Sequence, residues 1–295
     1  MMDTKKIKQF LKLKIINEPT VYLLQELFKV SETKDDYSFL FKSLINLAET
    51  ANNYNALKLL CMVSLKISKE QEAYDQILKY SKKIPNNVAI LSILSIMETL
   101  GSVEASSNYY NLDRDIHIFD INIKNDNLSS NNIIKYIEES SQENYEPDEQ
   151  SVSKGSVYFL SKKTHKYLDE FINEILNYFE KARLSIEKES PYKALKCDLS
   201  KLAFWAVKIK SGGNMEPHFH PKGCLSGVIY LDVDKNRSGD FIVGCSPSAI
   251  KNNENEKVVQ VQNMRLIIFP SYYFHRTKFN LTAKNRFSMS FDLTP

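Results

Sequence analysis

Glycine and proline are distributed very unevenly along the chain, and this constrains what it can fold into. Six of the eight glycines lie after residue 200, and six of the nine prolines lie at or after Pro191. Both residue types mark tight connections between short strands, so the last hundred residues are predicted to be rich in β-structure. The first hundred residues contain almost none of either. The chain is therefore predicted to be an α+β protein with two regions, the first of them helical.

Apolar residues in the first region recur at the spacing of an amphipathic helix. The clearest sets are Val21, Leu24, Leu27 and Phe28, and then Phe39, Leu40, Leu44 and Leu47. This periodicity predicts successive helices that share one core.

A longer pattern follows at Leu57, Leu60, Cys61, Ser64, Ala73, Ile77, Tyr80 and Pro85. It resembles the tetratricopeptide helix–turn–helix consensus, with small residues where helices cross and proline at the end of the second helix. A partial second unit would place Gly101 and Ala105 at the corresponding turn and crossing positions. Ordinary helix packing gives a similar pattern, so both interpretations stay open. Residues 1–110 are assigned to a helical, tetratricopeptide-like region.

The middle of the chain is polar between Asp120 and Ser156. This composition predicts a connection that contains one short helix around Ile133 to Ile137. Residues 164–186 then form a strong amphipathic pattern with an aromatic stripe, and we expect this helix to pack against a sheet. The stripe comprises Tyr167, Phe171, Ile175, Tyr178 and Phe179.

Composition excludes several classes of protein. Apolar residues make up 43% and charged residues 25%, which is typical of soluble globular proteins. The net charge of +3 is too balanced for the basic surface of most nucleic-acid-binding proteins. The longest apolar run, Val88 to Met97, is too short for a membrane span, and no secretory signal is visible. The four cysteines lie far apart without a Cys-x-x-Cys motif. We expect a cytoplasmic protein without nucleic-acid or membrane partners.

Three of the five histidines lie within one 58-residue window: His218, His220 and His275. Pro221 biases His220 towards an extended conformation. In an extended segment residues i and i+2 point to the same face, so the imidazoles of His218 and His220 could meet one metal ion. Such a pair alone is a weak signal, because pairs of this kind also occur by chance.

The surroundings of these histidines have a regular order. Strands are predicted at Leu225–Leu231, Asp240–Val243, Met264–Pro270 and Asn285–Phe291, with short turns between them. Strand, turn and strand at this spacing are typical of a double-sheet jelly roll.

Short motifs follow one another through this region. They are Gly212-Gly213, His218-Phe219-His220-Pro221-Lys222-Gly223, Ser226, Ile229-Tyr230, Phe269-Pro270-Ser271-Tyr272, His275, Thr277, Phe279, Arg286, Ser288, Phe291-Asp292 and Pro295. In order and spacing they resemble the iron(II)- and 2-oxoglutarate-dependent oxygenases, most closely those linked to tetratricopeptide repeats. The likeness covers roughly residues 145 to 295. It implies a double-stranded β-helix (jelly-roll or cupin-like) domain over 111–295, with a linker and entry segment at 111–156 and a core at about 195–295.

The resemblance also implies an iron site. His218 matches the first ligand and His275 the distal one, each a nitrogen donor suited to a metal held on one face. The oxygenases at large carry Asp or Glu where this chain has His220. Three alternatives stay open for the third ligand: His220, water, or a carboxylate such as Asp240 or Glu216. Our assignment is the set of three histidines.

The same resemblance assigns a cosubstrate site. Arg286 would pair with the distal carboxylate of 2-oxoglutarate, as a planar guanidinium can do bidentately. Ser288 would add a hydroxyl, and Tyr230 lies where related prolyl hydroxylases place a tyrosine that contacts the same carboxylate. The implied reaction uses O2, converts 2-oxoglutarate to succinate and carbon dioxide, and hydroxylates a C–H bond of an unidentified substrate.

Two alternative functions remain at this stage. One is a cupin-like metal dioxygenase that does not use 2-oxoglutarate. The other is a non-catalytic peptide-binding protein with a degenerate oxygenase domain. For partners, we expect a protein or peptide substrate that docks on residues 20 to 110. A small-molecule substrate, or helices that only cover the β domain or form a homodimer contact, are the alternatives.

Overall fold

The computed structural model describes residues 3–47, 50, 52–85, 87–100, 103–105, 108–144, 152–160, 165–192, 199–247, 250 and 255–294. The chain divides into two compact units, Met1–Tyr109 and Tyr110–Pro295. The predicted α+β class is confirmed, with helices in the first unit and antiparallel sheets in the second.

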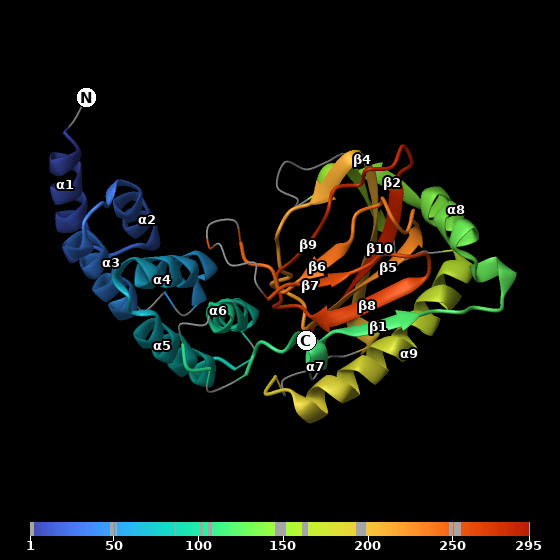
Figure 1. Cartoon of the computed structure of the whole chain (residues 1–295), viewed down its shortest axis with the longest axis horizontal. Helices are drawn as coiled ribbons and strands as arrows, with labels where there is room; N and C mark the ends of the chain where they lie inside the picture. Colours follow the sequence, from blue (N-terminus) through green and yellow to red (C-terminus); the bar gives the residue numbers. More distant parts are fainter. Residues whose placement is uncertain are drawn as a thin grey trace. The chain divides into compact units, whose positions relative to one another are not determined.

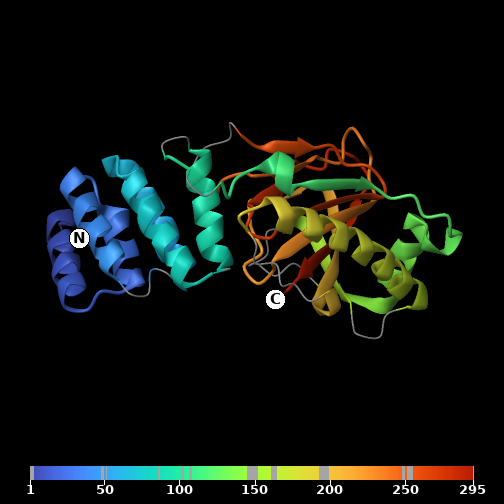
Figure 2. The same ribbon diagram turned by 90° about the horizontal axis from the view of Figure 1, so that it is seen from below.

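Within the described residues, the first unit consists of helices that each contact the next one along the chain (Figure 2). They are α1 (Thr4–Asn17), α2 (Val21–Val30), α3 (Lys34–Asn46), α4 (Tyr54–Ile67), α5 (Glu70–Lys83) and α6 (Val88–Thr99). Leu24, Leu27, Leu40 and Leu44 are fully buried between them. The periodicity of apolar residues in the sequence therefore did locate the shared core.

The start of α3 shows how local chemistry and packing combine. The Thr33 hydroxyl accepts a hydrogen bond from the Asp36 N–H, and the Asp36 carboxylate accepts one from the Thr33 N–H. This reciprocal capping box satisfies two N–H groups that the helix itself cannot pair. Asp36 is also buried against Lys12 and Lys8 of α1, with N–O distances of 2.6 and 3.3 Å. One carboxylate thus caps α3 and joins it to α1.

The tetratricopeptide-like stretch forms a helix hairpin, α4 and α5. Leu57, Leu60, Cys61, Ala73 and Ile77 are fully buried in it. Of the proposed second unit, Gly101 lies outside the described residues, and Ala105 lies in a segment without helix. The expectation of a helix crossing at Ala105 is therefore wrong. A single hairpin is also common in other helical proteins, so the tetratricopeptide likeness stays a prediction.

The second unit is built on two antiparallel sheets (Figure 1). In the described residues the larger sheet has the strand order β1-β8-β5-β10-β4-β3-β2, and the smaller has the order β7-β6-β9. The strands are β1 (His117–Asp120), β2 (Ser141–Asn144), β3 (Val152–Leu160), β4 (Leu202–Met215), β5 (Leu225–Asp232), β6 (Phe241–Val243), β7 (Lys257–Val259), β8 (Arg265–Pro270), β9 (His275–Thr277) and β10 (Arg286–Leu293). The four strands predicted around the histidines are present as β5, β6, β8 and β10.

The polar segment from 111 to 156 contributes more to the fold than a connection. It contains the short helix α7 (Leu112–Asp115) and the predicted helix, which is α8 (Ser130–Ser140). It also supplies β1, which pairs with β8, as well as β2 and the start of β3, which pairs with β4. The larger sheet therefore draws strands from before residue 156 as well as from the predicted core. Residues 145–151 lie outside the described part of the chain.

A helical layer covers the outer face of the larger sheet, where α8 and α9 (Lys166–Glu189) lie (Figure 1). Phe179 of α9 meets Phe291 of β10 edge-on, with ring centroids 5.9 Å apart. Gly227 of β5 lies directly under the ring, since a Cβ built there would be 2.7 Å from Phe179 Cζ. The aromatic stripe of α9 therefore packs on the sheet as expected, although Tyr167 and Tyr178 remain half-buried.

None of the helices in the described ranges is long and apolar enough to span a bilayer. Cys61 and Cys245 are free and buried, and Cys224 is disulfide-bonded. The cytoplasmic location stays a prediction.

Candidate metal centre

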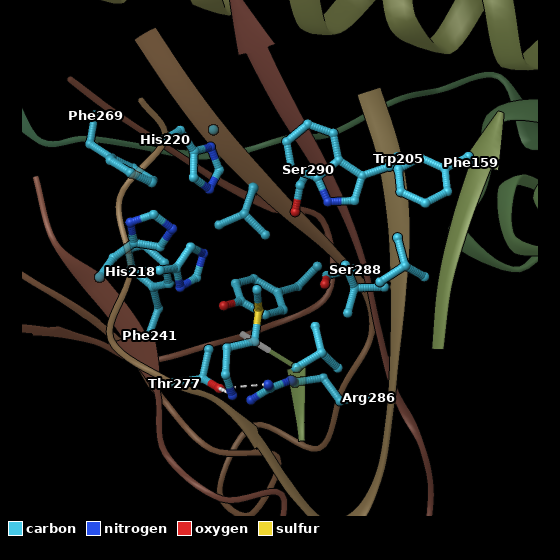
Figure 3. A pocket seen from close by; sticks show the side chains of 18 residues that line it. Phe159, Trp205, His218, His220, Phe241, Phe269, Thr277, Arg286, Ser288 and Ser290 are labelled. Atoms are coloured by element: carbon cyan, nitrogen blue, oxygen red, sulfur yellow. Dashed lines mark hydrogen bonds between the residues drawn. The ribbon is translucent and has the colours of Figure 1, made fainter. Parts of the chain in front are cut away.

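A cavity of about 340 Å3 lies between the two sheets. The larger sheet lines it with residues of β3, β4, β5, β8 and β10, and the smaller sheet with residues of β6 and β9. In Figure 3, His218 and His220 lie on one side of the cavity, Arg286 and Thr277 on another, and Trp205 and Phe159 form a further wall. The two facing sheets thus enclose one mixed polar and apolar chamber.

Alternation along β10 determines which of its side chains enter this chamber. Successive residues of a strand point to opposite faces of the sheet. Arg286, Ser288 and Ser290 line the cavity, whereas Phe291 packs against α9 on the other face. A single strand therefore presents a guanidinium and two hydroxyls to the cavity and an apolar edge to the helices.

The three candidate histidines converge at one end of the cavity. The His218 N–H donates to His275 O at 3.0 Å and the His275 N–H donates to His218 O at 2.9 Å, so the two segments run side by side. The N–H of His220 donates to Ser271 O at 3.0 Å. The ring centroids lie 4.2 Å apart for His218–His275, 4.9 Å for His220–His275 and 5.3 Å for His218–His220. One ligand atom from each ring lies within 4.8 Å of the others.

Each ring is held through its Nδ1 atom. His218 Nδ1 is 2.7 Å from Glu216 O, His275 Nδ1 is 3.1 Å from Tyr273 O, and His220 Nδ1 is 2.6 Å from Asp292 Oδ1. An imidazole that donates its Nδ1–H to an oxygen presents Nε2 as the basic atom, and this arrangement is typical of metal-bound histidine. The hydrogen bonds therefore select the tautomer that a metal needs.

Burial keeps two of these rings neutral. It lowers the pKa of His218 to about 4, with the neighbouring His220 adding to the effect. Burial, together with His218 and His220, also holds the pKa of His275 well below its usual value. A neutral imidazole is the form that binds a metal, so His218 and His275 need release no proton at neutral pH.

The alternative carboxylate ligands lie elsewhere. Asp240 Oδ2 pairs with Lys278 Nζ at 2.9 Å, beside a separate surface pocket. Glu216 accepts a hydrogen bond from Asn214 Nδ2 at 2.9 Å. In the part of the chain that the structure describes, only His218, His220 and His275 form a cluster of possible metal ligands. The geometry groups the histidines and leaves Asp240 and Glu216 out.

Arg286 is an unusual cation, because its side chain is buried (1% exposed) without a carboxylate partner among the described residues. Nη1 donates to Ser238 O at 2.8 Å, to Gly239 O at 3.1 Å and to Lys278 O at 3.4 Å. Nη2 donates to Thr277 Oγ1 at 2.7 Å (Figure 3). These bonds leave the Nε–H and one N–H of Nη2 without a protein acceptor in the described ranges. Burial lowers the pKa of Arg286; a guanidinium still remains charged.

Ser288 and Tyr230 lie next to Arg286 on the cavity wall. They are directly opposite each other across β10 and β5, and both line the cavity. Burial raises the pKa of Tyr230 to about 12, against the opposing effect of Arg286. The phenol is therefore neutral and able to donate a hydrogen bond at neutral pH. All six residues singled out in the sequence line this one cavity.

The structure gives roles to three residues for which the sequence analysis predicted none, although Thr277 and Asp292 stood in the motifs. Asp292 contacts His220, Thr277 orients Arg286, and Trp205 lies 5.6 Å from the His220 ring, centroid to centroid. A signal for Asp292 existed in the sequence, since it stood in the motif Phe291-Asp292 and continues the every-second-residue series of Arg286 and Ser288, one residue past the end of the predicted strand. Thr277 also stood in the motifs but without a predicted role, and Trp205 carried no such signal.

The donor set fits a divalent transition metal and a small dianion. Imidazole nitrogens suit iron, zinc, copper and nickel, and an isolated buried guanidinium is stabilised by a carboxylate or phosphate. Fold and site together define a jelly-roll-like domain with a cluster of three histidines that could hold one metal ion. Comparison with known families agrees with this class, because the family model described as "Putative 2OG-Fe(II) oxygenase" matches residues 203–292. This segment contains all six candidate site residues.

Solved structures give a weaker likeness. A Pseudomonas putida prolyl-4-hydroxylase matches with 13% identity and a TM-score of 0.46, over 62% of this chain and 94% of the other. A Trichoplax adhaerens prolyl hydroxylase in complex with a hypoxia inducible factor peptide fragment matches with 13% identity and a TM-score of 0.44, over 69% and 90%. HygX from Streptomyces hygroscopicus, with nickel, 2-oxoglutarate and hygromycin B bound, matches with 10% identity and a TM-score of 0.42, over 62% of this chain and 84% of the other. No curated protein matches the chain. All three TM-scores lie below 0.5, so no function is based on them.

Proposed function

We propose that this protein is an Fe(II)- and 2-oxoglutarate-dependent dioxygenase that hydroxylates a C–H bond of its substrate. The observation that carries the proposal is the pairing, in one cavity, of three convergent histidines with a buried arginine that has no carboxylate partner among the described residues. A metal site alone needs no such cation. An uncompensated buried charge is costly, and an anionic ligand that pairs with it removes that cost.

In this function His218, His220 and His275 hold iron through their Nε2 atoms, and the Nδ1 hydrogen bonds fix the ring orientations. Iron, 2-oxoglutarate and O2 together supply the oxidation, in which one oxygen atom enters the substrate and the other enters succinate as carbon dioxide leaves. The chain's own task is to position these groups and the substrate C–H bond, and to exclude water.

Arg286 binds the distal carboxylate of 2-oxoglutarate. Its Nε–H and the remaining Nη2–H form a donor pair that matches the spacing of two carboxylate oxygens. The neutral Tyr230 phenol and the Ser288 hydroxyl add donors from the same wall. Thr277 Oγ1 and three carbonyl oxygens already accept hydrogen bonds from the other edge of the guanidinium. The donor pair of Nε–H and Nη2–H is therefore oriented before the ligand binds.

The rest of the cavity wall indicates what kind of group reacts. It is mostly apolar, with Val152, Val157, Phe159, Trp205 and Val228 among its members. Apart from Arg286 and the histidines, no charged side chain in the described ranges lines it. We infer that the part of the substrate that enters is uncharged, since a charged group would lose its hydration here without a partner.

Anaerobic titration with Fe(II) and 2-oxoglutarate tests the assignment. The expected result is the weak visible charge-transfer band of a bidentate complex, followed by succinate formation when O2 is admitted. His218→Ala and His275→Ala should each weaken Fe(II) binding by at least about tenfold, since losing a ligand costs more than losing its hydrogen-bond partner. A cupin-like dioxygenase would bind Fe(II) without the band, and a non-catalytic protein would form no succinate.

His220→Ala decides the third ligand. Loss of Fe(II) affinity comparable to that of His218→Ala supports three histidines, and binding like that of the wild type would assign the third position to water or a carboxylate. His220→Asp, which restores the residue type common among the oxygenases, should retain Fe(II) if position 220 is a ligand.

For the helical unit we propose that residues 20 to 110 dock a protein or peptide that carries the substrate group. Helix hairpins build grooves suited to extended peptides. The test is a fragment that starts at Tyr110, because the Tyr110 hydroxyl contacts Gly244 O and Asn255 O. A folded fragment that still converts 2-oxoglutarate but no longer turns over the substrate supports docking. If the fragment is insoluble or loses iron, the helices belong to the fold and the docking proposal fails.

A further inference from the structure

The three histidine rings differ in what holds them. The Nδ1 atoms of His218 and His275 each face a backbone carbonyl two residues earlier in the chain, Glu216 O and Tyr273 O. The Nδ1 atom of His220 instead faces the carboxylate of Asp292, at 2.6 Å, from a strand 72 residues further along. Two rings therefore donate to neutral acceptors supplied locally, and one donates to a charged side chain.

Asp292 is itself held in place by a chain of hydroxyls. The Ser226 hydroxyl donates to Asp292 Oδ1 at 2.6 Å, and it lies 2.7 Å from Ser271 Oγ and 3.1 Å from His220 Nδ1. A hydroxyl has one hydrogen, so Ser271 must donate to Ser226 when Ser226 donates to Asp292. Ser226 and Ser271 are fully buried, and Ser226 is the cross-strand partner of Asp292. The carboxylate oxygen thus receives two directed hydrogen bonds, one from the serines and one from His220.

The backbone makes room for this arrangement at Gly223. A Cβ at that position would lie 2.6 Å from Ser271 Oγ and 3.3 Å from Asp292 Cγ. Any larger residue would push into the hydroxyl chain. The compact turn that follows His220 therefore depends on glycine, and it brings the imidazole, the serines and the carboxylate into mutual contact.

We infer that Asp292 is a positioning residue for the metal centre, acting through His220. A ring that donates to a carboxylate is fixed in tautomer and orientation, and its Nε2 is a stronger donor than that of a ring paired with a neutral carbonyl. The inference rests on the proposed metal site. It also explains how histidine can stand where related sequences carry a carboxylate, because the negative charge lies one hydrogen bond further from the metal position.

Binding of Co(II) to the intact protein, followed by its visible d–d absorption, tests this without turnover. Asp292→Asn keeps the side-chain shape and removes the charge; it should weaken Co(II) binding by roughly 10- to 100-fold and shift the bands. Asp232→Asn is the matched control, an exposed carboxylate at the end of β5 in the same sheet, and it should bind like the wild type. In a His220→Ala background, Asp292→Asn should cause no further loss of Co(II) affinity, because Asp292 acts on the metal site only through the His220 ring.

Melting of the metal-free proteins separates folding from metal binding. Should Asp292→Asn fail to fold, Ser226→Ala replaces it; this variant removes one of the two bonds to Asp292 Oδ1, together with the hydroxyl contact to His220 Nδ1, and should weaken Co(II) binding about two- to tenfold. The inference is overturned if the folded variant binds Co(II) like the wild type, or if its loss is equally large without His220. A wild-type protein that binds no Co(II) would instead refute the metal site itself.

Discussion

Arg286→Gln offers the sharpest test of the proposed cosubstrate site. Gln keeps a polar side chain but ends two bonds short of Nη1, so it removes the charge, the Nη1 bonds to the carbonyls of Ser238 and Gly239, and the donor pair formed by Nε–H and Nη2–H. Two charge-assisted hydrogen bonds contribute about 1.5–3 kcal/mol each, so about 3–6 kcal/mol of 2-oxoglutarate binding is at stake. At about 1.4 kcal/mol for each factor of ten, the affinity should fall by roughly two to four powers of ten.

Calorimetric titration of the metal-loaded protein with 2-oxoglutarate measures this loss, and Fe(II) or Co(II) binding measured in parallel should stay close to that of the wild type. Arg286→Lys keeps the positive charge but loses the planar pair of N–H donors. Its affinity for 2-oxoglutarate should lie between that of the wild type and that of Arg286→Gln. Arg237→Gln removes an exposed arginine outside the cavity and serves as the control. Unchanged 2-oxoglutarate affinity in a folded Arg286→Gln protein would refute the reasoning and favour a dioxygenase that does not use this cosubstrate. Equal loss of metal and 2-oxoglutarate would point to a folding defect.

Three further changes have defined outcomes. Thr277→Val removes the hydroxyl that orients Arg286 and should lower 2-oxoglutarate affinity about tenfold in the same titration, with metal binding retained. Gly227→Ala drives a methyl group into Phe179 and should destabilise the fold by about 1–3 kcal/mol in urea unfolding; wild-type stability would show that α9 can shift freely. Asp36→Asn should cost about 1 kcal/mol at pH 7. Burial alone would raise the pKa of Asp36, but hydrogen bonds, led by that from Lys12, hold it well below its usual value. The wild-type advantage is therefore complete above about pH 5 and declines as the pH falls below about 4; a constant difference would contradict this account.

The sequence predicted those parts of the fold whose signals are local. The strand at 286–293 alternates along its length, and the helix at 166–189 repeats its apolar residues with the period of one turn. By contrast, β1 is four residues long and buried only in part. It is a strand because β8, 145 to 151 residues later in the chain, pairs with it from His117 to Asp120. No local pattern can report a partner that is so far away in the sequence.

In the candidate site, too, the sequence predicted what depends on local pattern and missed what depends on contacts between distant segments. The alternation around His220 predicted that His218 and His220 share a face, and the resemblance supplied His275 and Arg286. The contact between Asp292 and His220 depends on where β10 passes the loop after β4, and that position is set by tertiary packing. The charge next to the third histidine could therefore be found only from the structure, although its residue was already visible in the sequence.

The order in which the chain is synthesised has a consequence for this sheet. β10 lies between β5 and β4 at the centre of the larger sheet, yet it leaves the ribosome after every other described strand of that sheet, because it follows them in the chain. Until it emerges, β4 and β5 each have an unpaired edge, and such edges are templates for aggregation. The helical unit precedes the sheet in the chain, so it is synthesised earlier and can fold while the sheet is still being made. The cavity can form only after β10 has been synthesised, because the strand that carries Arg286, Ser288 and Asp292 is also the strand that joins β5 to β4.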